Sequence, residues 1–293
     1  RETPARPVPA LAAAMASAGM AATLRAMVPL LVLGSAFHDT VEELGTVTLL
    51  QTGLTHQWEK KEAAALPQVG LRRTRSIPAA TVNLDLPPGQ RWVRFYSDPV
   101  NKYKLARYCE SERKPSAVLE SYMQAAVNKP DDQEYLEELR GIIAAVNDSR
   151  VTMSNLLAIN LAYENGVIGG CTGILAADAS GSVIHGRNID LPGLVLHWEA
   201  LLFDATFQRG GKTLFTATTT AGYVGVHTGF RDGAFSVAQN KRSGFEVEKI
   251  PQFLRQGARP NSFVVRQALQ EKASFKEAVH YLASQELAVP MYF

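Results

Sequence analysis

A cysteine, an arginine and a carboxylate stand close together along the chain in a pattern that suits nucleophilic chemistry. Cys171 follows two glycines, and Arg187 and Asp190 come 16 and 19 residues later in the run His-Gly-Arg-Asn-Ile-Asp. A thiol reacts as its thiolate, and a neighbouring positive charge lowers the thiol pKa from its usual value of about 8.5. Arg187 can supply that charge because a guanidinium stays protonated in proteins.

A hairpin would bring these side chains together. Residues 171–177 and 182–187 are typical of two strands, because short apolar runs flank the Asp-Ala-Ser-Gly cluster at 178–181. Antiparallel pairing returns Arg187 and Asp190 to the level of Cys171. If the chain were cut before Cys171, the new α-amine, with a pKa near 8, could act as the base for the thiol of the same residue. The alternative is an inert buried thiol beside a structural Arg–Asp ion pair.

The motifs around this hairpin resemble one enzyme family. The run from Cys171 to Asp190 is similar to the start of the catalytic subunit of acid ceramidase and of N-acylethanolamine-hydrolysing acid amidase, which are cysteine-type N-terminal nucleophile hydrolases. Further similar runs follow the family's order at residues 81–88, 91–92, 160–164, 221–225, 228–230 and 288–293. Several motifs in one order are more specific than any one of them.

The resemblance implies a precursor that cuts itself between Gly170 and Cys171. The α and β subunits of the same precursor would then be partners. Cys171 would be the nucleophile, its amine the base, Arg187 the cation near the thiolate, and Asp190 the carboxylate that holds the amine. The substrate would be a lipid amide, whose acyl chain forms a thioester before water releases it. The resemblance implies no cofactor.

An enzyme that cleaves lipid amides needs an apolar groove for the acyl chain. The candidates for its wall are Leu194, Leu196, Trp198, Tyr223, Val226 and His227. For each of them a place in the core is an equally good interpretation. The Asp-Leu-Pro-Pro segment and the Thr-Gly-Phe turn favour ceramide as substrate, whereas the short stretch between Asp190 and Phe207 is closer to the ethanolamide amidase.

Two features depart from the family pattern. Lys241 stands where the family has a glutamate between Asn and Arg, and a cation there reverses the local field. The family also continues past the position of Phe293 to an Asn and an Arg that complete the active site. That Asn supplies the oxyanion contact, and loss of one such donor costs about 100- to 1000-fold in rate. A degenerate paralogue that binds lipid without hydrolysing it therefore stays as an alternative.

The chain divides into three regions by composition and motif. Residues 1–79 form a leader, either a signal peptide, because 27–36 has the length and small-residue end of a signal-peptide core, or a disordered segment. Residues 80–170 form a mainly helical, α-subunit-like region. Residues 171–293 form the N-terminal part of the β subunit, and the absence of an initial Met suggests a fragment. The apolar segment 287–293 is then expected to be an unpaired strand edge.

Periodicity predicts an α+β fold. Helical spacing begins after Pro130 and again after Thr152, and short strands return between 201 and 239 with Gly210-Gly211 as a turn. Two helices follow near 261–272 and 274–284, the second with a Ser274/Glu277 capping box. This order fits part of the αββα sandwich that the resemblance implies.

Composition limits the other function classes. The net charge of +2 argues against a nucleic-acid platform. The six histidines lack ligand spacing for a metal, and two cysteines cannot define a disulfide framework. Asn147 begins an Asn-Asp-Ser glycosylation sequon, in keeping with a lysosomal or secretory route. The expected partners are a lipid amide and, peripherally, a lipid membrane surface.

Overall fold

The computed structural model describes most of the chain from residue 77 onward. It covers residues 77–293 apart from 112–115, 127–128, 167–169, 178–182, 191–200, 243 and 245. The chain divides into two units: one joins Arg1–Leu71 to Leu175–Ile184, and the other joins Arg72–Ile174 to His185–Phe293. The buried core lies in the second unit. Nearly all of the expected leader, residues 1–79, lies outside the described residues.

Four α-helices fill the region that the sequence predicts to be helical. They are α3 (Pro99–Ser111), α4 (Ala117–Ala126), α5 (Pro130–Val146) and α6 (Met153–Asn160), preceded by the short 3-10 turns η3 (Pro88–Gln90) and η4 (Phe95–Ser97). Pro130 opens α5, where its missing donor costs nothing, and Asn147 ends the helix in the left-handed conformation with φ 52°. Thr152 caps α6 by accepting a hydrogen bond from the Asn155 amide (3.2 Å). The helices predicted after Pro130 and Thr152 are thus confirmed.

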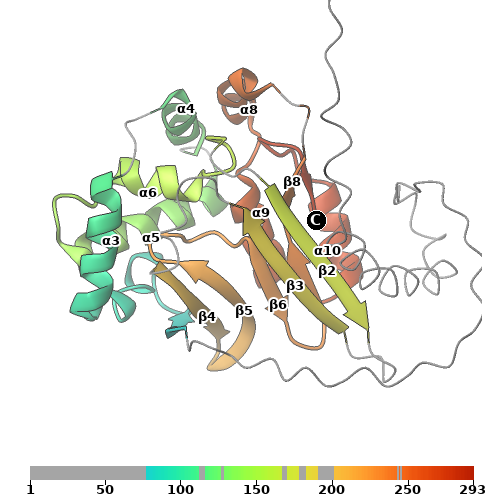
Figure 1. Cartoon of the computed structure of the whole chain (residues 1–293), viewed down its shortest axis with the longest axis horizontal. Helices are drawn as coiled ribbons and strands as arrows, with labels where there is room; N and C mark the ends of the chain where they lie inside the picture. The colour runs from blue at the N-terminus through green and yellow to red at the C-terminus, as the bar shows by residue number, and fades with distance from the viewer. Residues whose placement is uncertain are drawn as a thin grey trace, which may run out of the picture. The chain divides into compact units, whose positions relative to one another are not determined.

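Five strands form the main sheet, in the order β1-β4-β5-β6-β7. They are β1 (Ala79–Asn83), β4 (Leu202–Arg209), β5 (Lys212–Thr220), β6 (Thr228–Arg231) and β7 (Phe235–Ala238). β1 runs parallel to β4, and the other neighbours are antiparallel. The predicted Gly210-Gly211 turn joins β4 to β5, with positive φ at both glycines. Figure 1 shows α3, α5 and α6 grouped beside the β4–β5 part of this sheet.

The described C-terminal region is mainly helical, and its helix α9 packs on the sheet. It consists of η6 (Val247–Lys249), α8 (Ile250–Gln256), α9 (Asn261–Glu271) and α10 (Phe275–Ala283). Helix α9 contacts β5 and β6 and is buried along most of its length. Ser274 caps α10 by accepting from the Glu277 amide (3.3 Å), while the Glu277 carboxylate accepts from the Ala273 amide (2.8 Å). The predicted capping box therefore forms with the Ala273 amide in place of the Ser274 amide.

The last residues are not the unpaired edge that the sequence predicts, so this prediction is wrong. Strand β9 (Met291–Tyr292) pairs antiparallel with β8 (Asn240–Lys241). The Arg242 amide donates to the Pro290 carbonyl (3.2 Å), and the Ala288 amide donates to the Arg259 carbonyl (3.0 Å). Backbone groups of the terminal segment thus find partners in β8 and in the loop before α9, and Ala288 and Val289 are buried.

The hairpin that carries the cysteine forms a separate two-stranded sheet. It consists of β2 (Gly170–Ala177) and β3 (Val183–Asp190), which confirms the two strands predicted around residues 178–181. Helices and sheets together confirm the α+β class, while the αββα layering stays a prediction. Among the described helices, none has both the length and the apolar character needed to cross a bilayer.

A buried ion network ties the helices to the sheet. Arg266 of α9 is fully buried and donates to the Glu138 carboxylate (2.6 and 2.8 Å) and to the Val224 carbonyl (2.6 Å). Arg91 and Trp92 also donate to Glu138, at 2.8 and 2.6 Å. Burial by itself would raise the pKa of Glu138, but Arg266 and Arg91 lower it below its usual value. The carboxylate therefore stays charged and links α5, α9 and the segment before β6.

Close packing explains the glycines of the Ala-Gly-Tyr-Val-Gly motif. A Cβ added at Gly225 would collide with the Ser262 side chain on α9. Gly222 has φ 83°, which a larger residue adopts only with strain. Gly225 thus lets the segment between β5 and β6 pack tightly against α9, and Gly222 lets it pack against Leu105 of α3 and Leu156 of α6. This segment ends at His227.

Candidate functional site

The site is built around a direct contact between Cys171 and Arg187. The Cys171 Sγ, at the start of β2, lies 3.0 Å from Arg187 Nη2 on β3. The predicted proximity of the two side chains is therefore confirmed. The structure also places Gly170 as the first residue of β2 and Asp190 as the last residue of β3.

Backbone and side-chain oxygens fix the Arg187 guanidinium. Its Nη1 donates to the His227 carbonyl (2.9 Å) and to Thr228 Oγ1 (2.7 Å). Its Nη2 lies within hydrogen-bond distance of three acceptors, the Gln239 carbonyl, the Tyr163 hydroxyl (3.0 Å) and the sulfur, so one of its two N–H groups is shared. These acceptors hold the guanidinium, and therefore its positive charge, beside the thiol.

Tyr163 is a site residue that the sequence analysis did not assign. It follows α6, is 1% exposed, and its hydroxyl lies 3.3 Å from Cys171 Sγ and 3.2 Å from the Gln239 carbonyl. Its motif, Asn-Leu-Ala-Tyr-Glu, carries part of the family resemblance. Local spacing gives no indication that this hydroxyl reaches the sulfur, because tertiary packing brings the two together.

His227 forms the buried floor behind Arg187. Its Nδ1 accepts a hydrogen bond from Gln239 Nε2 (2.8 Å) and lies 3.2 Å from the Tyr223 hydroxyl. The Tyr223 ring stacks on the imidazole, with the two ring centroids 4.3 Å apart. Burial, together with the charge of Arg187, lowers the pKa of His227 to about 3. The imidazole is therefore neutral at pH 4 and above, and it supports the arginine without adding charge.

The predicted acyl-groove residues lie partly in this floor. The side chains of Tyr223, Val226 and His227 are all buried. They pack behind the Arg187 contacts, so their role as a groove wall stays a prediction. The other three candidates, Leu194, Leu196 and Trp198, lie outside the described residues. Asn147, the predicted glycosylation site, is exposed at the end of α5.

The segment with the departure from the family pattern runs beside the site. Gln239, whose carbonyl contacts Arg187 and Tyr163, is followed directly by Asn240 and Lys241 of β8. The Asn240 Nδ2 would lie 3.6 Å from a Cβ added at Gly173, two residues beyond Cys171. Lys241 thus belongs to a strand that borders β2, and its effect on chemistry stays a prediction.

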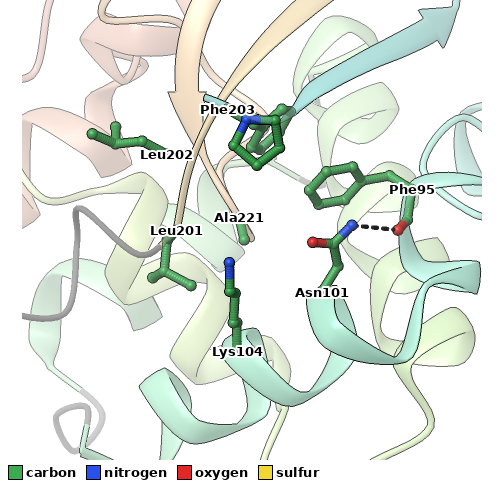
Figure 2. A pocket seen from close by; sticks show the side chains of 8 residues that line it. Phe95, Asn101, Lys104, Leu201, Leu202, Phe203 and Ala221 are labelled. Atoms are coloured by element: carbon green, nitrogen blue, oxygen red, sulfur yellow. Dashed lines mark hydrogen bonds between the residues drawn. The ribbon is translucent and has the colours of Figure 1, made fainter. Parts of the chain in front are cut away.

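A small pocket lies elsewhere in the second unit. Its lining residues are Pro78, Phe95, Asn101, Lys104, Leu201, Leu202, Phe203 and Ala221. Figure 2 shows Asn101 donating to the Phe95 carbonyl, with the Lys104 amine directed toward Leu201 and Ala221. The pocket shares no residue with the Cys171 contacts, and we assign it no catalytic part.

Comparison with known proteins agrees with the motifs. Acid ceramidase of Bos taurus is 30% identical over 276 residues, which are 85% of this chain and 68% of that protein. Human acid ceramidase is 32% identical over 253 residues, or 78% of this chain and 62% of that protein. N-acylethanolamine-hydrolyzing acid amidase of Mus musculus is 33% identical over 224 residues, or 74% and 59%. The chain thus spans about 59% to 68% of the length of these relatives.

Comparisons with family models and with solved structures give less support than the sequence relatives do. No family model matches the sequence. The Caenorhabditis elegans N-acylethanolamine-hydrolyzing acid amidase ortholog has 31% identity and a TM-score of 0.36, over 42% of this chain and 52% of that chain. The sequence relatives, whose similarity extends along most of this chain, are decisive: the chain belongs to the family of acid ceramidase and N-acylethanolamine-hydrolyzing acid amidase.

Proposed function

We propose that the protein hydrolyses the amide bond of N-acyl lipids, with Cys171 as the nucleophile. The observation that carries the proposal is the 3.0 Å contact between Cys171 Sγ and Arg187 Nη2. A guanidinium at this distance favours the thiolate, which is the reactive form. The names of the relatives, acid ceramidase and N-acylethanolamine-hydrolyzing acid amidase, supply the substrate class.

The proposed reaction begins with a cut between Gly170 and Cys171. The freed α-amine, held by Asp190, takes the thiol proton, and the thiolate attacks the amide carbonyl. The carbon–sulfur bond forms, the carbon–nitrogen bond breaks, and the ammonium returns its proton to the leaving nitrogen. Water then attacks the thioester, which releases the fatty acid and restores the thiol.

Ceramide is the substrate that we favour. The Asp-Leu-Pro-Pro and Thr-Gly-Phe motifs support it, and N-acylethanolamines are the alternative. A lysosomal or secretory location and peripheral contact with a lipid surface belong to the same proposal. Lys241, in place of the family glutamate, is the feature that favours a second candidate, a lipid-binding paralogue without turnover.

Substitution of the two contacting side chains tests the proposal. We expect Cys171→Ala to abolish both the cut and the hydrolysis of fluorogenic N-acyl amides at acid pH. Arg187→Lys should lower hydrolysis by about 10- to 100-fold, because lysine cannot replace the charge-assisted hydrogen bonds of the fork. Intact mass and turnover are the measurements.

The matched control is Arg140→Lys, which changes an exposed arginine on α5. Turnover by Arg187→Lys equal to that of this control would remove Arg187 from the mechanism. An uncut wild-type chain that binds the lipid amide without hydrolysing it would favour the paralogue instead.

A further inference from the structure

The hydroxyl of Tyr163 has more hydrogen-bond partners than it has protons. Arg187 Nη2, whose two N–H groups serve three acceptors, donates to it at 3.0 Å, so one oxygen lone pair is in use. The single phenolic proton then has two acceptors, the Gln239 carbonyl at 3.2 Å and Cys171 Sγ at 3.3 Å. A hydroxyl hydrogen can rotate about its C–O bond to suit either one. The choice between them depends on the charge of the sulfur.

The Tyr163 hydroxyl keeps its proton at acid and neutral pH. Burial raises the pKa of Tyr163 above its usual value, and Arg187 opposes this only in part. Two imidazoles lie near the same arginine. Burial and Arg187 lower the pKa of both His185 and His227, so neither adds positive charge beside the sulfur near neutral pH. Among the described residues, Arg187 and Tyr163 are the side chains within hydrogen-bond distance of Sγ.

We propose that Tyr163 is a catalytic residue whose hydroxyl follows the charge on Cys171. With a neutral thiol, the hydroxyl donates to the Gln239 carbonyl. When the thiol ionises, the hydroxyl turns to the sulfur, and the thiolate gains a second donor beside Arg187 Nη2. The Gln239 carbonyl keeps its hydrogen bond from Arg187 throughout, so no buried acceptor is left unpaired. The inference rests on the proposed function in taking the thiolate as the reacting form.

The test measures the sulfur directly and does not depend on lipid turnover. The full chain is alkylated with iodoacetamide over a range of pH, and the modified Cys171 peptide is quantified by mass spectrometry. Removal of one hydrogen bond to a charged group should raise the apparent pKa of Cys171 in Tyr163→Phe by about one unit. Tyr122→Phe is the control, because it also removes a buried hydroxyl, one with no hydrogen-bond partner among the described residues.

An unchanged apparent pKa in a folded Tyr163→Phe variant would overturn the inference, whether or not the protein hydrolyses lipid amides. If Tyr163→Phe does not fold, wild-type protein provides the second measurement. Raman difference spectra against Cys171→Ala should show the tyrosine doublet changing at the same pH at which the S–H band disappears. A tyrosine doublet that stays constant through that pH would overturn the inference equally.

Discussion

Two buried ionisable side chains flank Tyr163 and respond to pH in opposite ways. Glu164 is 1% exposed, and burial raises its pKa to about 7, although the Asn261 amide donates to its carboxylate (2.9 Å). His227 lies behind the Tyr163 ring at 5.2 Å, and burial lowers its pKa to about 3. Their ordinary values are 4.5 and 6.5. Both groups therefore prefer to be neutral in the folded protein.

The signs of the two contributions to stability follow from proton binding. Between pH 4.5 and 7 the folded state holds the Glu164 proton more tightly than the unfolded state, so its contribution is lost as pH rises. Between pH 6.5 and 3 His227 is protonated in the unfolded state and neutral in the folded state. The free energy of unfolding therefore decreases as pH falls. In the shared window, about pH 4.5 to 6.5, the two slopes oppose each other.

Single substitutions should separate the contributions of Glu164 and His227 to the pH dependence of the free energy of unfolding. Relative to wild type, Glu164→Gln should lose about 3 kcal/mol of unfolding free energy on going from pH 6.5 to 4.5, because the His227 slope is then unopposed. His227→Gln should gain a similar amount over the same interval. Urea unfolding at several pH values measures both. Parallel profiles for the two variants and for His280→Gln, an exposed histidine on α10, would show that neither buried group controls the response.

The contact between Cys171 and Arg187 was predictable from sequence because both residues belong to one hairpin, and hairpin register is local. Tyr163 and Gln239 were not, because tertiary packing brings them to the site. Tyr163 follows α6 and contacts the sulfur, whereas Gln239, between β7 and β8, contacts Arg187 and Tyr163 through its carbonyl. Tyr223 and Val226 were assigned to a groove wall from residue type alone. Type does not distinguish an open wall from a buried floor, and the structure places both side chains in the core.

At the scale of helices and strands, the salt bridge between α5 and α9 links the helices to the segment beside the site. Arg266 reaches Glu138 on one side and the Val224 carbonyl on the other, and Val224 lies three residues before His227. A buried ion pair that loses one partner leaves an uncompensated charge in the core. The network thus couples the position of α9 to the segment that carries the His227 carbonyl.

Removal of the arginine should therefore destabilise the whole second unit. We expect Arg266→Met to lower the free energy of unfolding by about 3 to 5 kcal/mol, because Glu138 stays buried without its main partner. Arg140→Met, at an exposed arginine on the same helix as Glu138, should change it by less than about 1 kcal/mol. Chemical denaturation monitored by tryptophan fluorescence measures both. Equal effects would contradict a structural role for the network.

Helix ends were easier to predict than sheet pairing. Pro130 and Thr152 mark helix starts through local hydrogen bonding, so a single sequence is enough. The final segment was misjudged because its partners, β8 and the loop before α9, lie more than 25 residues away along the chain. No local pattern in residues 287–293 specifies those partners.

At the scale of the whole molecule, the bond between Gly170 and Cys171 divides the chain into two segments that share one core. Strand β1 comes before this bond and pairs with β4, which comes after it. Glu138 comes before the bond and Arg266 after it. Tyr163 and Cys171, in contact at the site, are likewise on opposite sides.

A cut at that bond would consequently divide the chain into two polypeptides, and the two would still unfold together in one cooperative transition. Each product would hold part of a sheet and half of a buried ion pair, so neither would have a complete core without the other. Nicked protein should run as two bands on a denaturing gel, elute as one species from a sizing column, and melt in a single calorimetric transition. Two separate transitions would mean that the halves are autonomous. The pieces would behave as a complementing pair, in which the chain with the tyrosine serves as a permanent, noncovalent cofactor for the chain with the thiol.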